Sequence, residues 1–178
     1  DNEPNTHAGR ARELVLPRLL PWVAVVAAGG SALFGRAAVL GLGVDATTHA
    51  AEGTRIGDLR IDPVGEVHAL IHEDIPRISN VGVRLSAPGQ PTFFHPGDAL
   101  DADPGEVDVL GFPLNAPWQR SREMTAFLRR LGVARAFPIH DSLLAPHGRA
   151  LYLGQARTLG CPDTEVMDLL GRGAVTFS

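Results

Sequence analysis

The chain has no lysine, a single cysteine and no long uninterrupted apolar run. All 16 of its basic residues are arginine, and they are scattered along a chain whose formal net charge is −4. Because they form no basic stripe, nucleic acid is not an expected partner. The single Cys161 excludes an internal disulfide bond, and a reducing cytoplasm is the expected location.

The longest uncharged segment runs from residue 19 to residue 35. It is shorter than the roughly 20 apolar residues that a membrane-spanning helix needs. Pro21 and the pair Gly29–Gly30 also interrupt it, so no membrane association is expected. The composition, 44% hydrophobic and 20% charged over 178 residues, is typical of a globular protein with a real core. We therefore expect one domain that covers residues 1–178.

Segments with strand and helix patterns alternate along the chain. Ser121 begins a strongly amphipathic helix, and Gly132 is expected to end it. A turn at Ile56-Gly57-Asp58 separates two strand-like pieces. Further helices are predicted at residues 8–20, 31–40 and 146–158, and strands at 22–27, 81–85, 91–94, 107–112 and 134–139, with a short helix and a final strand, 174–177, after Gly160. This order predicts an α/β or mixed α+β fold.

Three of the seven histidines come at the ends of predicted strands. His68, His95 and His140 each lie close to Gly, Pro or Asp, where a rigid strand meets the loops in which sites are commonly built. Neutral imidazole and carboxylate are ligands that suit zinc and similar metals. Taken alone, each histidine is more often a hydrogen-bonded residue than a ligand. No His-x-His or Cys-x-x-Cys pair is present, so spacing alone makes only a weak case for a metal.

Four motifs in order carry a stronger signal: HALIHEDIPRISNVGVRL, FFHPGDAL, VDVLGFPLNAPW and AFPIHDSLLAPHGRAL. Together they resemble the C-terminal half of the metallo-β-lactamase-superfamily hydrolases, most of all the branch that includes ascorbate-lactonase-like proteins. The resemblance covers about half of the chain. It implies an αβ/βα sandwich with zinc or another divalent metal at the edge between two sheets.

The resemblance also implies roles for individual residues. His68 corresponds to a ligand of a first metal, Asp98 to the carboxylate that bridges two metals, and His140 to a ligand of the second metal. Asp98 and His140 would then carry the catalysis. Five further residues would orient the ligands or line the substrate pocket: His72, His95, Asn115, Trp118 and Asp141. Of these, His72 is also a less favoured substitute for His68 as a ligand.

The N-terminal part departs from the family pattern. The family motif His-x-His-x-Asp-His is expected just before residue 8, and an alignment through Pro4 places Asp1, Glu3, Asn5 and Thr6 at its ligand positions. The first strands of the family domain also have no counterpart. Three ligands would survive, divided between two metals, so metal affinity is expected to fall. The open sheet edge favours self-association into a homo-oligomer.

Two functions follow from this pattern. The first is a metal-dependent hydrolase that uses metal-bound hydroxide on a small ester, lactone or phosphoester. The second is a catalytically degenerate domain that binds a small molecule or a protein, or a fragment of a longer hydrolase. The retained His68, Asp98 and His140 favour the first, and the substituted motif favours the second.

Overall fold

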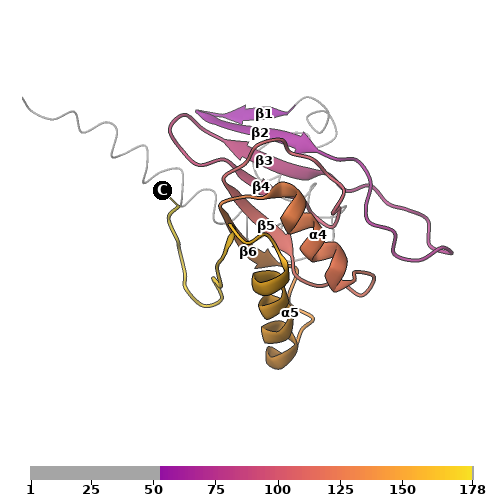
Figure 1. Cartoon of the computed structure of the whole chain (residues 1–178). Helices are drawn as coiled ribbons and strands as arrows, with labels where there is room; N and C mark the ends of the chain where they lie inside the picture. The colour runs from indigo at the N-terminus through magenta and orange to yellow at the C-terminus, as the bar shows by residue number, and fades with distance from the viewer. Residues whose placement is uncertain (1–52, 178) are drawn as a thin grey trace, which may run out of the picture.

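The computed structural model describes residues 53–177, which form one seven-stranded sheet and two helices (Figure 1). The strands lie side by side in chain order: β1 Thr54–Ile56, β2 Leu59–Val64, β3 Gly82–Ser86, β4 Phe93–His95, β5 Val109–Pro113, β6 Arg135–Ile139 and β7 Glu165–Val166. The helices are α4, Ser121–Leu131, and α5, Pro146–Leu159. The elements predicted within residues 8–40 and the substituted motif at residues 1–6 lie outside the described residues.

The sheet has an antiparallel half and a parallel half. Strands β1 to β4 pair antiparallel, whereas β4 to β7 pair parallel. Helix α4 connects β5 to β6, and α5 connects β6 to β7, because parallel neighbours need a crossover. The predicted turn at Gly57 and the predicted strands on both sides of Gly89 are confirmed.

Helix α4 begins and ends where the sequence predicts. At its start, the backbone N–H of Arg120 donates to the carboxylate of Glu123 at 2.8 Å. At its end, Gly132 adopts a left-handed conformation, with φ 55°, and its N–H donates to the carbonyl of Leu128. These two contacts satisfy backbone groups that the helix itself leaves unpaired.

The core lies between the two helices and one face of the parallel half of the sheet. Phe94, Leu110 and Ala136 are adjacent across β4, β5 and β6, and all three are fully buried. Helix α4 covers them with Met124, Phe127 and Leu128, and α5 with Leu153 and Ala156. This packing fixes the parallel strands, and therefore fixes the residues at their carboxyl ends.

The expected structure after Gly160 is wrong. No helix forms in residues 160–177, and residues 174–177 are not a strand. Instead β7 occupies the free edge of β6, with the N–H groups of Glu165 and Met167 donating to the carbonyls of Ala134 and Ala136. The apolar residue predicted to end the last strand, Phe177, stacks on Phe137, with 6.0 Å between ring centroids.

The described part of the chain confirms the mixed α/β class. None of its helices is both long enough and apolar enough to cross a membrane. The uncharged segment at residues 19–35 lies outside that part.

Candidate metal centre

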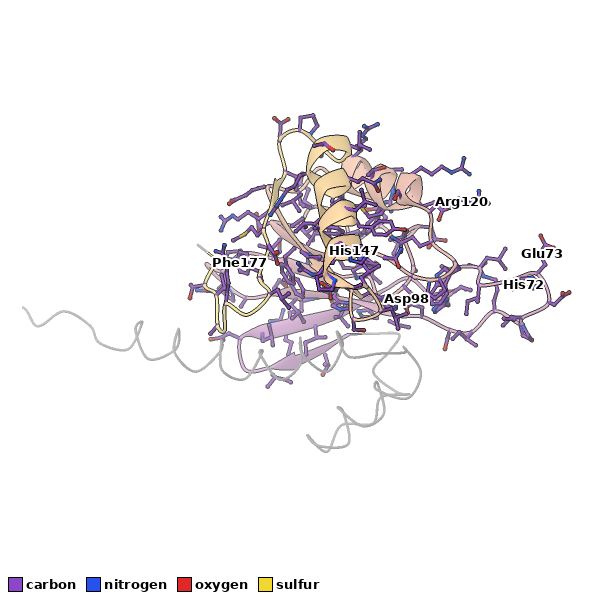
Figure 2. All side chains as sticks on the ribbon, turned by 90° about the horizontal axis from the view of Figure 1, so that it is seen from below. His72, Glu73, Asp98, Arg120, His147 and Phe177 are labelled. Atoms are coloured by element: carbon purple, nitrogen blue, oxygen red, sulfur yellow. The ribbon has the colours of Figure 1, made fainter. Side chains whose placement is uncertain are left out.

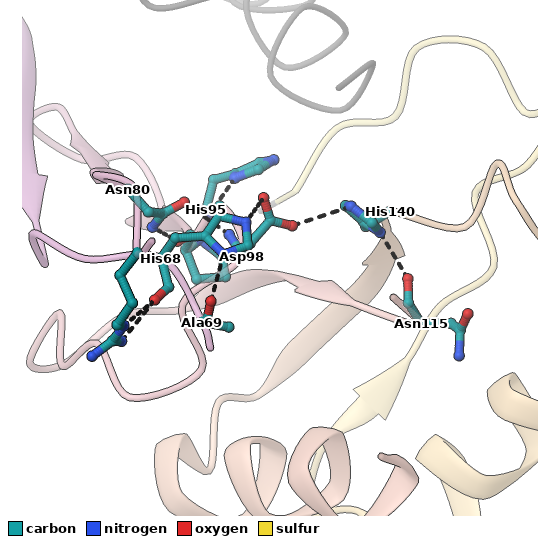
Figure 3. A network of polar contacts seen from close by, with 10 residues as sticks. His68, Ala69, Asn80, His95, Asp98, Asn115 and His140 are labelled. Carbon is teal, nitrogen blue, oxygen red and sulfur yellow. Dashed lines mark hydrogen bonds and ion pairs between the residues drawn. The ribbon is translucent and has the colours of Figure 1, made fainter. Parts of the chain in front are cut away.

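Three residues far apart in the sequence meet beside the ends of β4 and β6 (Figure 3). The carboxylate of Asp98 lies between two imidazoles. His68 Nε2 is 3.2 Å from Asp98 Oδ2, and His140 Nε2 is 3.1 Å from Asp98 Oδ1. His68 and Asp98 are buried, whereas 26% of the His140 side chain is exposed. The structure thus brings together the three residues predicted as metal ligands.

Backbone carbonyls fix the proton on each of the two imidazoles. The Nδ1 atom of His68 lies 2.7 Å from the carbonyl oxygen of Ala69, and that of His140 lies 2.7 Å from the carbonyl oxygen of Asn115. A carbonyl oxygen can only accept, so each Nδ1 carries a hydrogen. In a neutral imidazole, Nε2 then presents a lone pair to the Asp98 carboxylate, which is also an acceptor. A cation between the facing atoms would satisfy both, and a carbonyl on the other ring nitrogen is the usual arrangement of a metal-binding histidine.

The donor set fits a divalent metal, but the described residues do not enclose one. Imidazole nitrogen and carboxylate oxygen are the donor atoms that suit zinc and similar divalent metals. Asp98 Oδ1 is also buried without a hydrogen bond. However, the histidines face different carboxylate oxygens, so each position has two ligands. Accordingly, no group of three or more His, Cys, Asp or Glu side chains within residues 53–177 is arranged to hold one ion.

His95 is a buried neutral imidazole beside this cluster. It is only 3% exposed, and its Nδ1 accepts a hydrogen bond from the N–H of Gly97 at 3.0 Å. The hydrogen therefore sits on Nε2, which is buried and has no hydrogen-bond partner. Burial lowers the pKa of His95 to about 4. A hydrogen bond with its own backbone raises the pKa by less, and the charge of His140 lowers it slightly further. None of its hydrogen bonds goes to His68 or His140, so the predicted role in orienting a ligand has no contact to support it.

We expect His95 to make the fold less stable in mild acid. An unfolded chain takes up the proton below pH 6.5, but the folded chain does so only near pH 4. The contribution of neutral His95 to the free energy of unfolding is therefore fully present above pH 6.5. It decreases as the pH falls, by about 2 kcal/mol at pH 5. Urea unfolding at pH 7 and pH 5, with chelator present, measures this loss. His95→Asn, which keeps an acceptor for Gly97, should lose about 2 kcal/mol less than the wild type over the same interval. An equal loss in both proteins would contradict the assignment.

The turn that carries Asp98 is tied to a buried amide. Asn80 is 1% exposed, its Oδ1 accepts from the N–H of Asp98 at 3.0 Å, and its Nδ2 donates to the carbonyl of Pro96 at 2.8 Å. Gly97 lies between the two partners with φ 65°, and a Cβ atom there would overlap the Asn80 amide. The glycine therefore leaves the space in which the amide sits.

His140 has a strained backbone, and its neighbour Asp141 has another partner than predicted. With φ 55°, His140 is the only non-glycine residue with positive φ in residues 53–177. Asp141 was expected to orient a ligand, but its carboxylate accepts from Arg149 Nε at 2.6 Å. Arg149 also donates two hydrogen bonds to Asp168, at 2.8 and 2.9 Å, which lower the pKa of Asp168 to about 2. Asn115, not Asp141, contacts the His140 ring.

The aromatic ring of Trp118 lies beside the cluster. Its ring centroid lies 5.0 Å from that of His68 and 6.1 Å from that of His140. Asn115, in the same loop, contacts His140 through its backbone carbonyl. His72 is not brought to the cluster. Its side chain is 62% exposed, bonds to the N–H of Asp74 and lies with Glu73 at the tip of the loop between β2 and β3, away from Asp98 (Figure 2).

Sequence reasoning missed the residues that support the cluster. Arg77 donates to the carbonyl of His68 at 2.7 and 3.2 Å, Asn80 holds the Asp98 turn, and Arg149 holds Asp141. The glycine in His-Pro-Gly-Asp was a usable signal, since a turn glycine often marks positive φ. Asn80 had no such signal, because its side-chain partners are 16 and 18 residues away.

No protein-family model matches the chain. Among curated proteins, Protein Rv0786c of Mycobacterium tuberculosis is 35% identical over 130 residues, which are 72% of this chain and 60% of that protein. The chain therefore spans about three fifths of the relative that it matches.

Solved structures share the fold. A protein of Parabacteroides distasonis assigned as a metal-dependent hydrolase matches with a TM-score of 0.50 and 16% identity, over 66% of this chain and 54% of that chain. A Veillonella parvula protein named as a possible metal-dependent hydrolase matches with a TM-score of 0.50 and 10% identity, over 66% and 55%. The metallo-beta-lactamase fold protein YhfI of Bacillus subtilis has a TM-score of 0.49 and 14% identity, over 72% and 51%. The chain thus spans about half of each structure, and at these identities the likeness is one of fold.

Proposed function

We propose that the chain is the ligand-bearing part of a metallo-β-lactamase-type, metal-dependent hydrolase. The observation that carries the proposal is the Asp98 carboxylate placed between His68 Nε2 and His140 Nε2, with both Nδ1 atoms bound to carbonyls. The fold shared with proteins assigned as metal-dependent hydrolases supports it. The proposed substrates are small esters, lactones or phosphoesters, as in the ascorbate-lactonase-like branch.

Each of the three residues has a defined part in this proposal. His68 Nε2 and Asp98 Oδ2 would hold one divalent metal, such as zinc, and Asp98 Oδ1 and His140 Nε2 a second. Water would complete the ligands. A metal there supplies Lewis acidity and makes water acidic enough to ionise near neutral pH.

The residues around the ligands prepare the site for substrate. The carbonyls of Ala69 and Asn115 hold the two imidazoles in the tautomer that binds metal. The ring of Trp118, 5.0 Å from that of His68 between centroids, offers an apolar surface to a substrate. His140 is partly exposed, so a substrate would approach the site from its side.

A catalytically degenerate binding domain is the second candidate. One observation favours it: the described residues provide only two ligands at each metal position. Metal binding would then be weak or lost, while the shape of the site would still accept a small molecule or a partner chain.

The metal content of the purified protein decides between the two candidates. After dialysis without chelator, we expect near-stoichiometric zinc, manganese or iron by inductively coupled plasma mass spectrometry. The loaded protein should hydrolyse p-nitrophenyl acetate or bis(p-nitrophenyl) phosphate, and lose this activity with chelator. A folded protein that stays free of metal, even after incubation with zinc, would refute the hydrolase and favour the degenerate domain.

A further inference from the structure

We propose that Asn80 is a positioning residue for Asp98 and so sets the metal affinity of the centre, an inference that rests on the proposed function. The hydrogen bonds of the Asn80 side chain go to Pro96 and Asp98, and neither goes to an imidazole. Asn80 acts on the carboxylate through the backbone of the turn that carries it, because its Oδ1 accepts from the N–H of Asp98 itself.

Asn80 also belongs to the segment that holds His68. The N–H of Asn80 donates to the carbonyl of Glu66 at 3.1 Å, and the N–H of His68 donates to the carbonyl of Ile78 at 2.9 Å. A bridge between Val67 and Ser79 lies between these two bonds. His68 and Asn80 are thus on facing pieces of one short antiparallel ladder. The Asn80 side chain joins this ladder to the turn after β4, and so fixes Asp98 relative to His68 (Figure 3).

The position requires the two different functions of an amide group. Asp98 offers an N–H and needs an acceptor, whereas Pro96 offers a carbonyl and needs a donor. An asparagine side chain provides one of each in a single plane. Because Asn80 is 1% exposed, water has little access to replace either bond. The Asp98 carboxylate must face two imidazoles at once, so a small rotation of this turn would lengthen at least one of the two contacts.

The test is zinc affinity by isothermal titration calorimetry, made under conditions in which each variant is fully folded. Asn80→Ala is expected to bind zinc 10- to 100-fold more weakly than the wild type, the range typical of residues that orient metal ligands. Thr125→Val is the matched control. It also removes a buried polar group, a hydroxyl whose hydrogen is shared between the backbone carbonyls of Ser121 and Arg122, but this group lies on α4. Its zinc affinity should stay within about twofold of wild type, since general loss of stability does not move the affinity of folded protein.

Wild-type affinity in Asn80→Ala, measured on folded protein, would overturn the proposal. If that chain does not fold, Asn80→Ser carries the same test, because a single hydroxyl satisfies one partner but does not span both. If the wild type binds no zinc, the proposed function fails, and the metal-free crystal structure of the variant tests Asn80 by itself. A shift of the Asp98 carboxylate away from His68 or His140 is then expected, and retention of both contacts at 3.1–3.2 Å would overturn the proposal.

Discussion

Asp98→Asn is expected to weaken zinc binding at least 100-fold, about 2.7 kcal/mol, and to abolish hydrolysis. Asp98 is the only residue of the cluster that faces both imidazoles, so its loss affects both metal positions. Asparagine has the same shape but no charge, and its NH₂ group can donate to one histidine Nε2 in place of a metal. The fold should therefore survive. Zinc titration and p-nitrophenyl acetate turnover measure the two effects.

Asp103→Asn is the matched control for this substitution. Asp103 is exposed, and its carboxylate accepts from the N–H of Gly105 in a turn, a bond that asparagine can keep. The control should bind zinc as the wild type does. If Asp98→Asn retains full metal content and turnover, any metal in this protein binds somewhere other than between His68 and His140.

Local signals explain why much of the fold could be predicted. The helix from Ser121 to Leu131 has an apolar face, an acidic first turn and a terminal glycine, all within its own segment. The two hairpin turns likewise contain the glycines that define them. In contrast, β7 has only two residues and exists because β6 has a free edge, which no local pattern reveals. The wrong prediction at residues 174–177 used the apolar pattern alone, and Phe177 satisfies it by stacking on Phe137.

The sequence predicted which three residues form the cluster, but not which side chains hold them in place. His68, Asp98 and His140 were identified by the order of four motifs, and the parallel arrangement of β4, β5 and β6 explains how the last two come to one edge of the sheet. Asp141 was predicted to orient a ligand because it is adjacent to His140. Its side chain instead faces Arg149, eight residues further on, in the helix that it precedes. The fold decides in which direction the side chain of an adjacent residue points, and adjacency in the sequence does not.

Gly97→Ala should destabilise the fold, with a loss of about 2–5 kcal/mol in the free energy of unfolding. An L-residue at its φ of 65° costs about 1–2 kcal/mol. The added methyl also overlaps the Asn80 amide, which adds about 1–3 kcal/mol of overpacking or the loss of buried hydrogen bonds. Gly89→Ala is the control, because Gly89 has almost the same φ, 66°, and nothing lies within 4 Å of its added methyl.

Urea unfolding of the two glycine variants separates backbone strain from the clash with Asn80. Gly89→Ala should lose only the cost of the left-handed conformation, so the two variants should differ by the cost of the clash, about 1–3 kcal/mol. Equal losses would mean that the Asn80 amide moves aside without cost, and a side chain that moves so freely would not hold Asp98 in place. A large difference would show that the amide is fixed between Pro96 and Asp98, as the positioning role of Asn80 requires, whether or not a metal is bound.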